Sequence, residues 1–156
     1  MSQSAPRGLL DTSTIIMLPR LRDATALPAV PLISTITLAE LSVGPLVATP
    51  DEERVARQAH VQQAEADFDP LPFDAAAARA FGRVAASLRR ARRKPTARSY
   101  DAMIAAVAIA NDLPLYTCNP GDFEGIDELR IVPVPTPASR TDAAHRGHSP
   151  PASGES

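Results

Sequence analysis

The sequence predicts an α/β protein built around a mainly parallel sheet. Short apolar runs rich in β-branched residues alternate along the chain with stretches of helical length, which is typical of repeated strand and helix units. A length of 156 residues and a hydrophobic content of 44% suit one domain with one core. The predicted strands are residues 8–10, 32–36, 70–73, 113–116 and 130–134, and the predicted helices are residues 12–21, 37–43, 51–66, 74–92 and 99–111.

Two of these helices have a distinct apolar pattern. Residues 99–111 read SYDAMIAAVAIAN and are apolar nearly all round, so we expect this helix to be buried on most sides, with Ser99 as a candidate N-cap. In residues 74–92 the apolar positions recur every three or four residues and predict one buried face, formed by Ala76, Ala80, Phe81, Val84 and Leu88.

Composition excludes several classes of protein. No run of about 20 apolar residues and no secretory signal occur, so we expect a cytoplasmic protein without membrane contact. The single Cys118 excludes an intramolecular disulfide framework, and the position of this thiol predicts a small hydrophobe. Residues 136–156 contain no large apolar side chain, which predicts a disordered tail after a domain spanning residues 1–135.

Four acidic residues stand where a packed α/β core has little use for charge. Asp11 follows the first apolar run, Glu40 lies in the apolar segment LAEL, Asp101 opens the most apolar helix, and Asp122 lies in the turn after residues 113–116. Each has a purely structural alternative. Asp11 could cap a helix, Glu40 could close a capping box with Thr37, Asp101 could complement a helix dipole, and Asp122 could stabilise its own turn.

Taken together, the four acids favour a cation site. In a parallel sheet, the carboxyl ends of adjacent strands and the starts of the following helices lie along one rim. Carboxylates that meet there repel one another unless a cation is bound. Mg²⁺ suits such a site because it retains water and is held by a few carboxylates plus a substrate phosphate. Metal-assisted phosphodiester hydrolysis is therefore the leading chemistry.

Three segments carry a resemblance to a known family. The segments LLDTSTII at residues 9–16, TLAELSVG at 37–44 and SYDAMIAAVAIANDLPLYTCNPGDFEGI at 99–126 resemble the PIN-domain ribonucleases, and in particular the VapC toxins of bacterial toxin-antitoxin pairs. The last segment is the most specific of the three. The resemblance covers roughly the first 135 residues, in the order and spacing of the family.

The resemblance implies a three-layer α/β/α fold with an acidic pocket for Mg²⁺, or Mn²⁺ in its place. It assigns the catalytic acids to Asp11, Glu40, Asp101 and Asp122, with Asp11, Asp101 and Asp122 as metal ligands. Supporting polar residues would be Thr12, Ser13, Thr117 and Asn119, although many relatives have an acid where this chain has Asn119. RNA cleavage to a 5′-phosphate and a 3′-hydroxyl, a cognate antitoxin and a homodimer are implied as well.

A basic block precedes the last acidic helix. Its members could hold RNA phosphates beside the acids, or they could form the solvated, dipole-complementing end of the helix at residues 74–92. Both interpretations are open from the sequence. The block consists of Arg89, Arg90, Arg92, Arg93, Lys94 and Arg98.

Other functions fit the sequence less well. An aspartyl-phosphate phosphatase needs a second carboxylate two residues after Asp11, where this chain has Ser13, and no glycine-rich nucleotide loop occurs. The remaining alternative is a catalytically idle PIN-like module that acts through a protein partner. Retention of four acids argues against that alternative.

His60 lies in a mostly polar helix and is predicted to be exposed.

Overall fold

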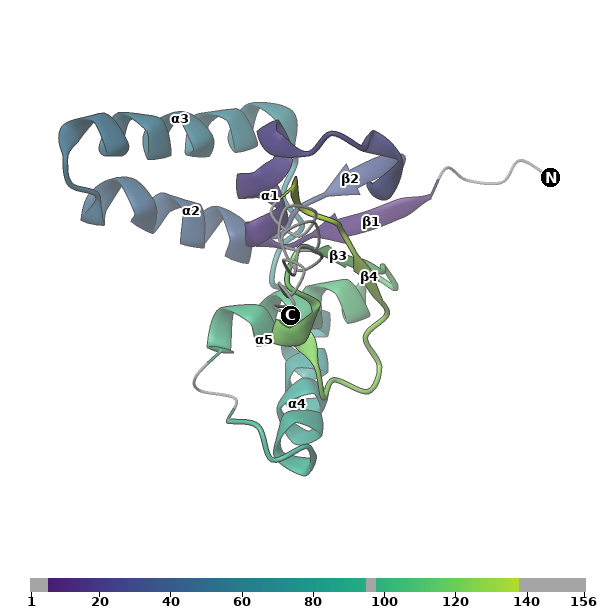
Figure 1. Ribbon diagram of the computed structural model, residues 1–156. Coiled ribbons are helices and arrows are strands. Elements are labelled where there is room, and N and C mark those ends of the chain that lie inside the picture. Colours follow the sequence, from purple (N-terminus) through teal and green to yellow (C-terminus); the bar gives the residue numbers. More distant parts are fainter. Residues whose placement is uncertain (1–5, 95–97, 138–156) are drawn as a thin grey trace, which may run out of the picture.

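The computed structural model describes residues 6–94 and 98–137, and it forms a four-stranded sheet between two layers of helices (Figure 1). The strands are β1 (Arg7–Leu10), β2 (Val30–Leu32), β3 (Leu115–Thr117) and β4 (Ile131–Pro133). All neighbouring strands are parallel, in the order β2-β1-β3-β4. This arrangement confirms the predicted α/β class with a parallel sheet.

The two faces of the sheet carry separate hydrophobic cores because successive strand residues point to opposite sides. Leu9 and Leu115 face α4 (Ala75–Arg90) and α5 (Ser99–Ala110). Leu10 and Tyr116 face the other layer, formed by α1 (Thr12–Met17), α2 (Thr35–Val47) and α3 (Asp51–Asp67). In Figure 1, α2 and α3 run side by side and extend beyond the edge of the sheet.

Helix α5 lies at the centre of the larger core. Ala102 and every residue from Ile104 to Ala108 are buried, as the all-round apolar pattern predicts. Its partner α4 buries a stripe that includes Val84 and Leu88, although Ala77 rather than Ala76 belongs to that stripe. Helix α5 begins one residue earlier than a Ser99 cap would place it, since Arg98 occupies the N-cap position.

Two strand predictions differ from the structure. Residues 32–36 were expected to be extended, but Ser34 accepts a hydrogen bond from the Thr37 amide and starts α2 at Thr35. The expected strand at residues 70–73 is reduced to one bridge between Leu71 and Ser34. Pro70 and Pro72 flank that bridge, and proline has no amide hydrogen to extend a ladder.

Two helices end earlier in the structure than the sequence predicts. The expected helix at residues 12–21 ends at Met17 and continues as a 3-10 turn, Leu18–Arg20, because Pro19 cannot donate to the preceding turn. The expected helix at residues 74–92 ends at Arg90, and Arg92 has a φ of 59°, a left-handed conformation that terminates helices. Apart from Thr136 and Pro137, the predicted tail at residues 136–156 lies outside the described residues.

Gly125 lies where the turn after β3 meets the end of α4. This glycine has a φ of 89°, and a Cβ added to it would approach the Ala91 Cβ to 2.9 Å. We expect Gly125→Ala to lower the free energy of unfolding by about 1–3 kcal/mol, through backbone strain and overpacking. Gly82, on the exposed face of α4 with no atom within 4 Å of an added Cβ, is the control. Urea denaturation should show that Gly82→Ala is neutral or stabilising, and an equally harmless Gly125→Ala would contradict this account.

Candidate active site

The candidate site lies where the strand order reverses. The chain passes from β1 to β2 on one side and reaches β3 on the other side of β1. Such a reversal leaves a crevice beyond the carboxyl ends of the two central strands, and open α/β sheets bind their ligands there. Asp11 directly follows β1, and Thr117 is the last residue of β3. The Asp11 amide donates to the Tyr116 carbonyl at 3.2 Å and keeps the two strand ends together.

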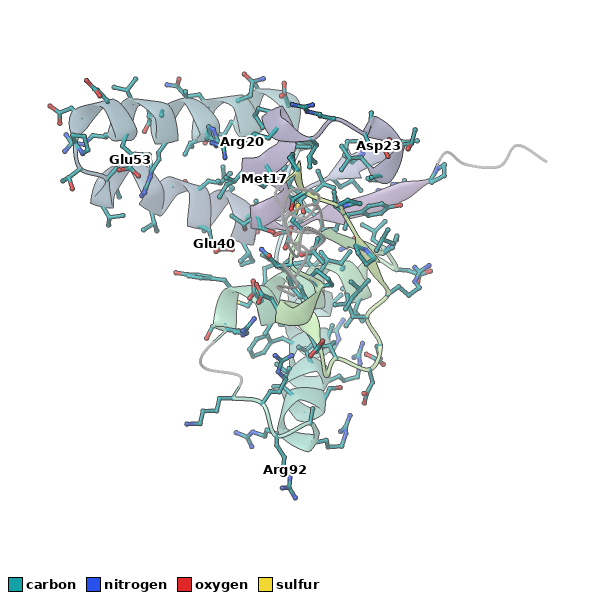
Figure 2. The ribbon with its side chains drawn as sticks, viewed as in Figure 1. Met17, Arg20, Asp23, Glu40, Glu53 and Arg92 are labelled. Atoms are coloured by element: carbon teal, nitrogen blue, oxygen red, sulfur yellow. The ribbon has the colours of Figure 1, made fainter. Side chains whose placement is uncertain are left out.

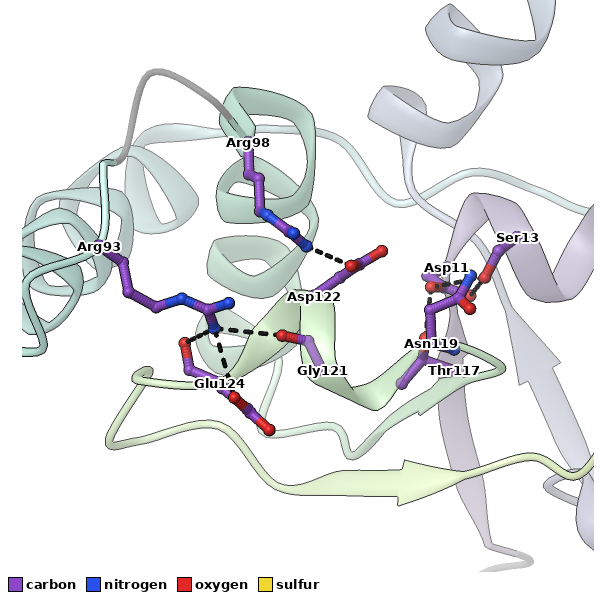
Figure 3. Close-up of polar contacts among 9 residues, drawn as sticks. All are labelled: Asp11, Ser13, Arg93, Arg98, Thr117, Asn119, Gly121, Asp122 and Glu124. Atoms are coloured by element: carbon purple, nitrogen blue, oxygen red, sulfur yellow. Dashed lines mark hydrogen bonds and ion pairs between the residues drawn. The ribbon is translucent and has the colours of Figure 1, made fainter.

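Asp11 is 4% exposed and accepts hydrogen bonds from four donors. The Thr14 hydroxyl and the Thr117 hydroxyl each lie 2.6 Å from one of its carboxylate oxygens, and the Thr14 amide lies 3.0 Å away. The Ser13 hydroxyl lies 3.0 Å from both oxygens (Figure 3). Asp11 therefore does cap α1, which was its structural alternative, but three hydroxyl groups also fix its orientation at the crevice.

Thr14 and Thr117 also connect Asp11 to the turn after β3. The Thr14 hydroxyl accepts from the Cys118 amide at 3.2 Å, and the Thr117 hydroxyl accepts from the Asn119 amide at 3.0 Å. Thr117 and Asn119 were among the predicted polar residues of the site, whereas Thr14 was not, although it lies within the segment LLDTSTII. Burial raises the pKa of the Cys118 thiol, in keeping with its predicted role as a small hydrophobe.

Glu40 projects from α2 toward α1. The Thr12 hydroxyl donates to Glu40 Oε1 at 2.7 Å. The capping box with Thr37 is wrong, because Ser34 caps this helix and Thr37 lies inside it. Burial raises the pKa of Glu40, the Thr12 hydrogen bond lowers it, and the negative charge of Asp11 raises it further. The negative charge of Asp11, at the start of α1, therefore acts on Glu40 of α2.

Asp101 lies in the first turn of α5 and experiences the charges of the other three acids. Burial raises the pKa of Asp101 to about 6, assisted in turn by repulsion from Asp122, Glu40 and Asp11, while Arg98 opposes the shift. The fold therefore brings the four acids into one electrostatic group. Asp122 belongs to the 3-10 turn Pro120–Phe123, and its carboxylate pairs with the Arg98 guanidinium (Figure 3).

The donor set suits a hydrated hard cation. In residues 6–94 and 98–137, no three His, Cys, Asp or Glu side chains are clustered as ready ligands of one ion. The predicted ligands Asp11, Asp101 and Asp122 thus do not form a closed three-residue cage. Carboxylate oxygens that repel one another nevertheless match Mg²⁺, which is commonly bound through one or two carboxylates and several waters.

The basic block separates into groups with different contacts. Arg93 donates to the carbonyls of Gly121 and Glu124 at 3.1 and 2.7 Å and thereby holds the turn that carries Asp122 (Figure 3). Arg90 pairs with Asp127 at 3.0 Å, and Arg98 pairs with Asp122. Within the described part of the chain, no ion pair involves the three other members, which are Arg89, Arg92 and Lys94.

A cavity of about 220 Å³ joins the basic block to the acids. Arg92 lies at the far end of α4, near the lower edge of the molecule in Figure 2, whereas Glu40 lies in the opposite layer. The charged residues that line the cavity are Arg92, Arg93, Lys94, Arg98, Asp101 and Asp122. Positive groups thus stand directly beside two of the four acids.

A second hollow of about 460 Å³ lies between α1, α2 and α3. Thr12 and Glu40 line it at the acidic end, and Ile16 and Leu41 contribute apolar surface. His60 is half-buried and lines the same hollow, so the prediction that His60 is exposed is wrong. Packing of α3 against α2 places His60 there, and the local sequence does not encode that contact.

Comparisons with known proteins agree with the fold. The pattern of the PIN domain family matches residues 9–129. Ribonuclease VapC5 of Mycobacterium tuberculosis is 36% identical over 136 residues, which cover 86% of this chain and 98% of that protein. The chain therefore belongs to the PIN-domain family, and its relatives within that family include VapC ribonucleases.

Solved structures give the same result. A crystal structure of VapBC-5, a member of the VapBC family of toxin-antitoxin systems from Mycobacterium tuberculosis, has a TM-score of 0.70 and 34% identity, and covers 82% of this chain and 98% of that chain. A DNA-bound VapBC structure from Salmonella typhimurium has a TM-score of 0.63 and 29% identity, and the match covers 82% of this chain and 97% of that chain.

None of the helices in the described ranges is both long and apolar enough to span a bilayer.

The shifted pKa of Asp101 predicts a pH dependence of stability. Because the pKa of Asp101 is about 6 in the folded protein and 3.8 ordinarily, the folded state binds the proton more tightly. Metal-free stability should fall as pH rises from about 4 through about 6. Asp101→Asn should then exceed the wild type by roughly 1 kcal/mol at pH 7.5, since water screens a half-buried carboxylate, and the two should converge near pH 4. Urea denaturation in EDTA measures this difference.

The exposed Asp69 supplies the control. Asp69→Asn should follow the wild type at every pH. A wild type that is as stable as Asp101→Asn at pH 7.5 would show that burial and the neighbouring carboxylates do not raise the pKa of Asp101.

Proposed function

We propose that this chain is a divalent-metal-dependent ribonuclease that acts as the toxin of a toxin-antitoxin pair. The observation that carries the proposal is the convergence of the negative charges of Asp11, Glu40 and Asp122 on Asp101 at the strand-order reversal, with basic side chains beside it. Repulsion among acids favours a cation, and basic groups favour a polyanion. The ribonuclease relatives and the VapBC structures support this choice of activity and biological role.

Asp11 and Asp101 are the residues we assign to hold Mg²⁺ or Mn²⁺, with Asp122 as a third contributor. A bound divalent ion supplies Lewis-acid polarisation of the scissile phosphate and lowers the pKa of a water molecule. Asp11 is suited to this role because four hydrogen-bond donors fix its carboxylate before any ligand arrives. Pre-organised charge of this kind needs little rearrangement during reaction.

Glu40 is assigned to orient the attacking water. Thr12 engages Glu40 Oε1, which leaves Oε2 to accept a proton from water. The raised pKa of Glu40 makes it a better proton acceptor than an exposed carboxylate. In-line attack of this water on phosphorus would break the P–O3′ bond, and the departing 3′ oxygen would take a proton from solvent, which gives a 5′-phosphate and a 3′-hydroxyl. Ser13, Thr117 and Asn119 support the site indirectly, because they hold Asp11 and the turn after β3.

Cleavage assays with carboxylate variants test the activity. Asp11→Asn and Asp101→Asn should each reduce metal-dependent cleavage of total RNA by at least about 100-fold, since each removes charge that stabilises the transition state. Glu65→Gln, an exposed acid of α3, should retain wild-type cleavage. EDTA should abolish cleavage by the wild type.

Folded, partner-free Asp101→Asn protein that cuts RNA at the wild-type rate would refute this assignment. Wild-type protein that cuts no RNA class with either metal would favour the alternative function, an idle PIN-like module that works through a partner.

Arg92 and Lys94 are assigned to bind RNA phosphates, because they line the cavity and have no ion-pair partner in the described part of the chain. The double variant Arg92→Gln/Lys94→Gln should bind single-stranded RNA more weakly. The slope of log K against log salt should fall by about 0.7 for each phosphate that the variant no longer neutralises. Fluorescence anisotropy between about 50 and about 200 mM salt gives this slope.

Arg83 provides the matched control, since it lies on α4 away from the cavity and pairs with Glu128. Arg83→Gln should leave the salt slope unchanged. Equal slopes for the double variant and the wild type would assign these side chains to the solvated end of α4 instead.

An antitoxin segment is assigned to the hollow between α1, α2 and α3. Apolar side chains are exposed around it and on the adjoining helix ends, including Ile16 at 47%, Leu46 at 84% and Val55 at 69%. Contiguous apolar surface of this kind commonly marks a protein contact. Glu40 at the acidic end would attract a basic side chain of the antitoxin. Homodimerisation, which the resemblance also implies, is proposed on the apolar helix surface outside this hollow, where Leu46 and Val55 are exposed.

A further inference from the structure

The ion pair between Arg98 and Asp122 connects the basic block to the acids. Arg98 occupies the N-cap position of α5, and Asp122 lies in the 3-10 turn after β3. Arg98 Nη1 donates to Asp122 Oδ1 (Figure 3). Both side chains line the same cavity as Asp101. Arg98 is thus a positive charge placed inside the region where a divalent ion is expected.

This ion pair is open to exchange. The Arg98 and Asp122 side chains are 44% and 41% exposed, and ion pairs with that much access to water are weak. Arg93, in contrast, is held by two backbone carbonyls of the turn. Among the described basic residues that line the cavity, Arg98 is therefore the one whose partner is an acid of the site.

The same guanidinium has a second partner available when RNA binds. Guanidinium groups engage phosphate through paired hydrogen bonds, as they engage carboxylate. Arg92 and Lys94 line the cavity beside Arg98 and attract a polyanion into it. A phosphate that enters the cavity meets Arg98 next to Asp122.

From these contacts we propose that Arg98 is an exchangeable counter-ion of Asp122. In the free protein Arg98 neutralises Asp122 and competes with a divalent cation for it. An RNA phosphate in the cavity takes over the guanidinium and releases Asp122 to the cation. RNA and metal therefore bind cooperatively, and each raises the affinity for the other by the same factor. This inference rests on the proposed metal-dependent nuclease function and adds the order in which the site assembles.

The opposing effects on Asp101 agree with this role. Arg98 lowers the pKa of Asp101, whereas Asp122, Glu40 and Asp11 raise it. Movement of Arg98 toward a phosphate would leave the four carboxylates without that compensation. The site would then bind a divalent cation more strongly than in the free protein.

Mn²⁺ binding to the full chain tests the proposal without relying on activity. Electron paramagnetic resonance of free Mn²⁺ gives the affinity of the partner-free protein. Arg98→Gln should bind Mn²⁺ at least about 5-fold more tightly than the wild type, within the range of typical coupling between sites. Arg92→Gln, which removes a positive charge from the same cavity but no partner of Asp122, is the matched control and should change the affinity by less than about 2-fold.

Two further measurements separate the proposal from a general charge effect. The double variant Arg98→Gln/Asp122→Asn should lose the gain in Mn²⁺ affinity that Arg98→Gln shows, because Arg98 acts through Asp122. A phosphorothioate RNA tetranucleotide should raise the Mn²⁺ affinity of the wild type by a larger factor than that of Arg98→Gln, after subtraction of Mn²⁺ bound by the oligonucleotide alone, because only the wild type has an ion pair to exchange. Thermal melting verifies that each variant is folded.

Unchanged Mn²⁺ affinity in Arg98→Gln, or an equal gain in Arg92→Gln, overturns the proposal. If the wild type nevertheless shows metal-dependent RNA cleavage in the same experiments, the nuclease function stands and only the exchange by Arg98 is refuted. Absence of both Mn²⁺ binding and RNA cleavage in wild type and variants refutes the nuclease function together with this inference.

Discussion

Repulsion among carboxylates at the carboxyl ends of β1 and β3 is the constraint on which the rest of this structure depends. The sheet order places Asp11 at that point, and α2, α5 and the turn after β3 add Glu40, Asp101 and Asp122. Burial and neighbouring charges raise the pKa of Asp101 to about 6, so the folded protein retains unfavourable electrostatic energy. Perturbed groups of this kind are commonly found at functional sites, where a ligand can relieve the repulsion.

Other features of the chain reduce or use this repulsion. Hydroxyl groups of Ser13, Thr14 and Thr117 replace water around the buried carboxylate of Asp11. Arg93 fixes the turn that carries Asp122 through backbone carbonyls, and Gly125 allows that turn to approach the end of α4. Arg98 supplies the compensating positive charge. The basic segment is therefore part of the architecture of the acidic site as well as a surface for RNA.

Local sequence patterns could predict the class of fold and the positions of the acids, but not the contacts between distant segments. Asp11 and Asp101 are recognisable because each adjoins an apolar segment whose strand or helix is locally encoded. Glu40 shows the limit of such patterns, since the capping-box motif fits Thr37 but Ser34 caps α2 and Thr37 lies inside the helix. The pairing of Arg98 with Asp122, 24 positions away, depends on how the turn after β3 packs against α5.

Anomalous diffraction from crystals of the partner-free protein soaked in Mn²⁺ tests most directly whether the carboxylate group is a divalent-metal site. We expect a manganese peak at about 2.1 Å from a carboxylate oxygen of Asp11 or Asp101, with water completing the coordination shell. The account would be contradicted if well-diffracting crystals showed no manganese beside any of the four acids and the same protein still cleaved RNA in EDTA.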